Sequence, residues 1–129
     1  MQSAALLVSA CLFGGMVLYA FGFAPFLFSA LPADQAGPLI RRAFPWFYLL
    51  VMVCSALAAA LLLAVDPLSA SLMAAILLTT VPTRQVLMPA INAATDAGQS
   101  GRFKLHHTLS VVITLAHIIA VAYVLTRFL

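Results

Sequence analysis

Four apolar stretches, each long enough to cross a membrane, constrain the fold of this chain more than any other feature. They are Ala4–Leu31, Trp46–Val65, Leu68–Ala90 and Leu105–Leu129. A helix needs about 20 residues to cross a hydrocarbon core about 30 Å thick. With only 7% charged residues, the 129-residue chain could not cover the surface of a soluble domain. We therefore predict one all-α integral membrane domain over residues 1–129, a four-helix transmembrane bundle. The spans are expected at about residues 4–31, 46–65, 68–94 and 105–127.

The connection between the first two stretches, Leu31–Pro45, is longer than a turn. Four of its apolar residues share one helical face while Arg41 and Arg42 point away, which predicts a short interfacial helix between the first and second spans. The alternative is a plain loop whose arginines set the topology. The apolar residues of that face are Leu39, Ile40, Ala43 and Phe44.

The basic residues are distributed unevenly along the chain. Four helices place the connections Leu31–Pro45 and Thr95–Lys104 on one side of the membrane, and these hold four basic residues. The other side holds both termini, Asp66 and the lone Arg127. Because basic residues concentrate in cytoplasmic loops, we expect both termini to be periplasmic in a bacterial inner membrane. Basic residues in these positions would interact with anionic lipid headgroups, so we expect the lipid bilayer as partner and no nucleic acid.

The fourth stretch carries a polar stripe. His107, Ser110, Thr114 and His117 are separated by three, four and three residues, so they share one face of a helix. Polar side chains at membrane depth are costly unless they face a bundle interior. The stripe is therefore the best sequence indication of a functional site.

Arg84, near the cytoplasmic end of the third span, is the most costly residue to place in a membrane. It could snorkel to the headgroups, or it could face the polar stripe as an anion-binding group. In the second case Asn92 and His107 would orient the anion. The candidate binding residues are Arg84, Asn92, Asp96, His107, Ser110, Thr114 and His117.

Missing residue types exclude several functions. The chain has no Glu, and its three Asp residues lie in connections or at helix ends, so no membrane-buried carboxylate could exchange protons for a substrate. No Ser-His-Asp hydrolase motif is present either, and we lean against an enzyme. The leading hypothesis is a binding or transport-accessory module with a cytoplasm-facing polar pocket for an anionic lipid or small molecule. A structural subunit whose histidines and arginine only pack and snorkel is a third possibility.

The rival hypothesis is a haem- or porphyrin-handling redox protein with His107 or His117 as axial ligand. All three histidines lie on or at the start of the fourth span, so an opposing ligand would have to be a methionine. We expect no haem and no metal ion.

The remaining small residues favour helix packing. Cys11 and Cys54 lie on different spans at a spacing typical of neither a disulfide framework nor a zinc motif, which indicates packing residues. Two small-residue faces would allow a homo-oligomer. These faces are Gly14, Leu18 and Gly22 in the first span, and Ala56, Ala60 and Ala64 in the second.

A series of short motifs in matching order resembles the transmembrane-protein-205-like family. The strongest part contains Pro89, Asn92 and Asp96, followed by Phe103, His107 and Ser110. Further matches extend over nearly the whole chain: Gly15-Met16-Val17, Phe21-Gly22-Phe23, Leu27-Phe28, Ala36-Gly37 and Phe44-Pro45-x-Phe47-Tyr48. The resemblance implies a four-span membrane protein and no established reaction. Thr114 stands where that family usually has Asn, and His117 lies outside the pattern.

Overall fold

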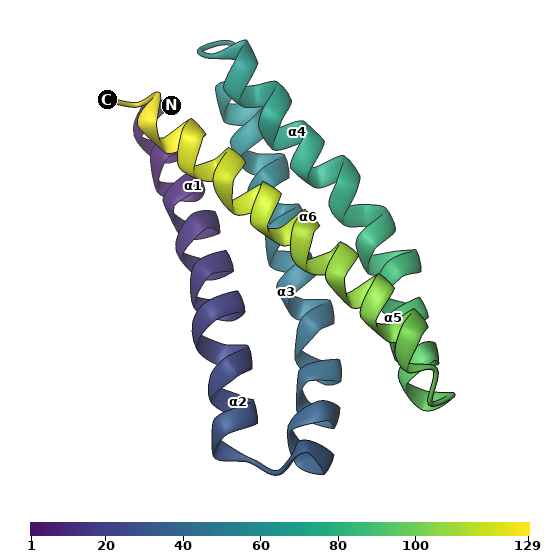
Figure 1. Cartoon of the computed structure of the whole chain (residues 1–129). Helices are drawn as coiled ribbons and strands as arrows, with labels where there is room; N and C mark the ends of the chain where they lie inside the picture. Colours follow the sequence, from purple (N-terminus) through teal and green to yellow (C-terminus); the bar gives the residue numbers. More distant parts are fainter.

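Four long helices make up the protein, whose computed structural model describes residues 1–129 and contains no strand. They run over Gln2–Ala30, Ala33–Leu62, Pro67–Asp96 and Ser100–Thr126 (Figure 1). All four are long and apolar enough to cross a membrane. The predicted all-α membrane bundle is therefore confirmed.

The first and third long helices each contain a π-helical segment. α1 (Gln2–Val17) is followed by η1 (Leu18–Phe23) and α2 (Ala24–Ala30). In the same way α4 (Pro67–Pro82) is followed by η2 (Thr83–Leu87) and α5 (Met88–Asp96). A proline lies two residues after each π segment, at Pro25 and Pro89. Because proline lacks an N–H and crowds the preceding turn, the helical ladder widens there. The second and fourth helices, α3 (Ala33–Leu62) and α6 (Ser100–Thr126), have no such break.

The prediction of a separate interfacial helix between the first and second spans is wrong. Residues 33–45 are helical, but they form the first turns of α3 and continue into the membrane span through Pro38 and Pro45. Packing of the aromatic side chains explains the continuity, since Tyr19 of η1 stacks on Phe47 with ring centroids 4.8 Å apart. Tyr19 also meets Phe44 edge-on, with ring centroids 5.7 Å apart, so its contacts hold α3 on both sides of Pro45 against the first helix.

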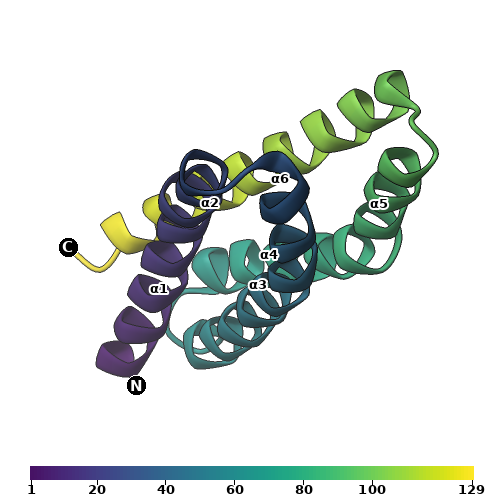
Figure 2. The ribbon, with the colours of Figure 1, turned by 90° about the horizontal axis from the view of Figure 1, so that it is seen from below.

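α3 lies at the centre of the bundle, with α1 on one side and α4 on the other. α6 crosses the bundle, and its C-terminal part meets α1 while its N-terminal part meets α5 (Figures 1 and 2). The buried core is small and draws on all four long helices. It includes Leu12, Met16, Val51, Met73 and Val121.

One ion pair joins neighbouring helices at each end of the bundle. At the end that holds both termini, Arg127 donates to Asp66 from Nε at 2.6 Å and from Nη2 at 2.9 Å. Asp66 also caps α4 by accepting from the Ser69 backbone N–H at 3.3 Å. Hydrogen bonds from Arg127 and then Ser69 hold the pKa of Asp66 well below its usual range. At the opposite end, Arg41 of α3 pairs with Asp96 of α5 at 3.0 Å.

Candidate functional site

A cavity of about 700 Å³ lies between the third long helix and α6. Its lining is mostly apolar and comes from α4, η2, α5 and α6. It extends from Leu72 and Ala120, near the end that holds the termini, to Ala90 and His106 near the opposite end. This volume lies within the range of ligand pockets, about 300–1,000 Å³. We call this cavity the α4–α6 groove.

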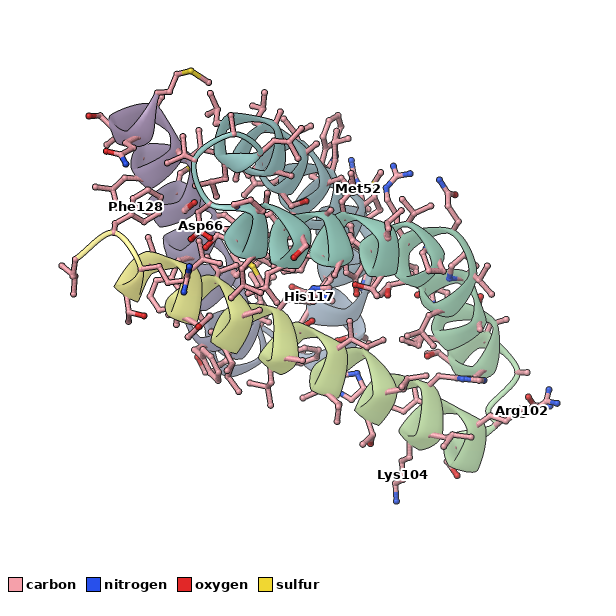
Figure 3. The ribbon with its side chains drawn as sticks, turned by 90° about the horizontal axis from the view of Figure 1, so that it is seen from above. Met52, Asp66, Arg102, Lys104, His117 and Phe128 are labelled. Atoms are coloured by element: carbon pink, nitrogen blue, oxygen red, sulfur yellow. The ribbon has the colours of Figure 1, made fainter.

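His117 is fixed at the wall of the groove by a bond between helices. Its Nε2 lies 2.7 Å from Oγ1 of Thr79 on α4, and Figure 3 shows the side chain between the two helices. The single hydroxyl proton of Thr79 can also be donated to the carbonyl of Ala75, which lies 2.7 Å from Oγ1. With the proton donated there, the Thr79 oxygen accepts from His117 Nε2–H; with the other histidine tautomer, the hydroxyl donates to Nε2.

The π segment η2 forms part of the groove wall. Thr83, Val86 and Leu87 of η2 line the cavity. The hydroxyl of Thr83 donates back to the carbonyl of Thr79 at 2.7 Å, and the same carbonyl also accepts from the backbone N–H of Thr83. Single π turns inside α-helices occur frequently at functional sites. The π segment of the third long helix therefore lies at the groove.

A free cation lies on the groove face of α6 near its start. His106, Leu109 and Ile113 line the groove, and Arg102 lies one turn before His106 on the same helical face. Lys104 falls on the opposite face, and Figure 3 shows Arg102 and Lys104 pointing in different directions. Both side chains are exposed and neither is in an ion pair.

Of the seven candidate binding residues, only His117 lines the groove. Arg84 is half-buried and donates from Nε to the carbonyl of Pro45 at 3.4 Å, so it faces α3 rather than the polar stripe. Asp96 is paired with Arg41, which also contacts the backbone carbonyl of Asn92 at 3.4 Å. The expected convergence of these side chains on one polar pocket is not present.

The rest of the polar stripe also lies outside the groove. His107 is exposed and stacks on Phe103, with ring centroids 5.3 Å apart. Ser110 is buried and donates to the carbonyl of His107 at 2.8 Å, within its own helix. Thr114 is half-buried. The groove face of α6 runs through His106 instead, one residue and therefore about 100° from the expected face.

Sequence reasoning missed His106, Thr79 and Arg102 as candidates for the site. Helical spacing could have indicated His106, because His106 and His117 both lie on the groove face of α6. The two histidines are eleven residues apart on one helix, a rise of about 16 Å, so they could not bind one iron together. The haem hypothesis remains a prediction, which an absorption spectrum of the purified protein would test.

Comparison with known proteins places the chain in a family. Residues 7–100 match a family model described as a domain of unknown function, DUF4149. The match covers the first three long helices almost completely and ends at the start of α6. No curated protein and no solved structure matches the chain. Since the matched residues make up well over half of its length, the chain belongs to the DUF4149 family.

Proposed function

We propose that the protein is a membrane-embedded binding module whose α4–α6 groove holds an acyl chain of an anionic lipid. The headgroup would lie at the Arg102 end of the groove. The observation that carries this proposal is an apolar groove of about 700 Å³ with an unpaired cation, Arg102, one turn beyond the lining residue His106 on the same face of α6.

The groove lining suits an apolar chain. Residues such as Ile76, Val86 and Leu109 supply most of its surface, and burying one methylene stabilises a complex by about 0.8 kcal/mol. The bond between His117 and Thr79 satisfies the imidazole Nε2 within the protein, as donor or as acceptor. That part of the groove therefore accepts a chain without leaving this nitrogen unpaired.

Some of the basic side chains are bound to partners within the protein, and others have none. Arg41 is bound to Asp96, and Arg84 donates to a backbone carbonyl of α3. Arg102 is unpaired and lies one turn from His106, at the membrane-surface end of the groove. A guanidinium binds phosphate with two parallel hydrogen bonds, which favours Arg102 as the headgroup contact. Another amphipathic anion would use the same chemistry, and a transport-accessory role would build on the same bound ligand.

The proposed orientation follows from the ends of the bundle. Both termini lie at one end of the bundle (Figure 1). The opposite end holds the basic residues in the first turns of α3 and α6, which are Arg41, Arg42, Arg102 and Lys104. We propose that the termini are periplasmic in a bacterial inner membrane. The similarity to the transmembrane-protein-205-like family belongs to this proposal too, since a four-span protein of unestablished activity suits both families.

Self-association is a further part of the proposal. The small residues Ala56 and Ala60 of α3, and Ala64 in the turn that follows it, are exposed in the single chain. Small side chains let two helix backbones approach closely in a membrane. A second copy of the chain would therefore be expected to pack on this face of α3.

Native mass spectrometry of the purified protein tests the lipid proposal. We expect phosphatidylglycerol to be retained more strongly than phosphatidylcholine with the same chains. Arg102→Gln should weaken phosphatidylglycerol binding by roughly tenfold, because charge-assisted bonds contribute about 1.5–3 kcal/mol. Lys104→Gln on the opposite face is the matched control. Equal losses in both variants would show that only a general surface charge matters.

Filling the groove tests the acyl-chain part separately. Ala116 lines the groove, so Ala116→Trp should weaken the binding of both lipids. Val111 is 40% exposed on the opposite side of α6, and Val111→Trp should leave both affinities unchanged. Unchanged binding in Ala116→Trp would contradict occupation of the groove.

A further inference from the structure

The two cysteines of the chain are brought together where α1 packs against α3. A Cβ added at Gly15 of α1 would lie 3.0 Å from Cδ2 of Leu50 on α3, so the missing side chain lets the two helices approach closely. α1 and α3 are antiparallel neighbours. One turn before Gly15 stands Cys11, and one turn after Leu50 stands Cys54.

This register places Cys11 and Cys54 opposite each other across the contact between α1 and α3. Both cysteines are free, with Cys54 buried and Cys11 exposed. Cys11 is nine residues beyond the start of α1, which is about 14 Å along the helix and close to the middle of a bilayer. A reagent that reaches the pair must therefore dissolve in the hydrocarbon.

We propose that Cys11 and Cys54 form a redox-active dithiol that closes to a disulfide between α1 and α3. The oxidant would be a lipid-soluble quinone. In the closing reaction the two S–H bonds break and one S–S bond forms. The two protons and two electrons pass to the quinone, which becomes the hydroquinone. The proposal does not depend on the α4–α6 groove, which lies on other helices.

The direct test uses the reduced protein in lipid nanodiscs with a short-chain, fully substituted benzoquinone, to whose ring a thiol cannot add. We expect one hydroquinone for each disulfide formed. The intact mass should fall by two hydrogen atoms, and N-ethylmaleimide should then add to neither cysteine. Two maleimide adducts with the quinone unreduced would overturn the proposal. Covalent dimers joined through Cys11 would overturn it as well.

Two glycine variants test the geometry without changing either thiol. Gly15→Leu should push α1 from α3 and slow disulfide formation by about tenfold or more, since a shift of about 1 Å can cost a reaction that much. Gly14→Leu is the matched control, because a Cβ there meets nothing within 4 Å. Cys54→Ser should keep one maleimide adduct and reduce no quinone. Equal oxidation rates in the two glycine variants would contradict the proposed contact.

Discussion

Replacing Thr79 by Val tests the bond that joins α4 to α6 at the groove. The substitution keeps the branched shape and removes the oxygen that lies 2.7 Å from His117 Nε2. It also removes the local bond from the Thr79 hydroxyl to the carbonyl of Ala75. Thr95→Val is the matched control, because the hydroxyl of Thr95 bonds only to the carbonyl of Ile91 in its own helix, at 2.9 Å.

The expected magnitude follows from the geometry of the bond. Hydrogen bonds between membrane helices contribute about 0.6 kcal/mol on average and about 1.7 kcal/mol at most. The short distance between Thr79 and His117 places this bond above that average and below that maximum. We therefore expect a coupling free energy of about 1 kcal/mol between the two side chains, which is roughly fivefold in the unfolding equilibrium.

A double-mutant cycle in mixed detergent micelles measures this coupling. The free energy of unfolding is compared for the wild type, Thr79→Val, His117→Phe and the double variant. Thr95→Val gives the cost of losing a bond within one helix. A coupling energy indistinguishable from zero would refute the bond between helices.

Three further outcomes are expected. Because the pKa of Asp66 is lowered in the folded state, its contribution to stability is present above the unfolded pKa of about 3.9 and lost as the pH falls below it. Arg127→Gln should therefore reduce the acid dependence of the melting temperature, and an unchanged profile would contradict this. Gly98 has φ +65°, so Gly98→Ala should cost about 1 kcal/mol in unfolding free energy, whereas Gly101→Ala should cost nothing. A reporter active only in the cytoplasm, fused after Leu129, should stay silent, and a strong signal would reverse the topology.

Much of the fold could be predicted from the sequence because apolar length in a membrane protein determines which segments become helices. The start of α3 could not be predicted, since Pro38 and Pro45 usually favour a break. Continuity there depends on the contacts of Tyr19 with Phe44 and Phe47, which lie far from it in the sequence.

The candidate site was less predictable for a related reason. Helical spacing shows which side chains share a face of α6, but it does not show which neighbouring helix that face meets. The position of α4 makes His106 and His117 face the groove, while His107 stacks on Phe103. The hydrogen bond from Arg84 to the carbonyl of Pro45 likewise depends on packing between α3 and the third long helix.

Photo-crosslinking with an anionic lipid tests the central claim most directly. A phosphatidylglycerol with a photoreactive group in its acyl chain would be incorporated into nanodiscs with the protein, and the labelled residues mapped by mass spectrometry. We predict labels concentrated on the groove face of α6 and on the facing part of the third long helix, around Leu109 and Val86. Excess unlabelled phosphatidylglycerol should displace these labels. Labels spread evenly over the exposed apolar residues of all four long helices would contradict the account.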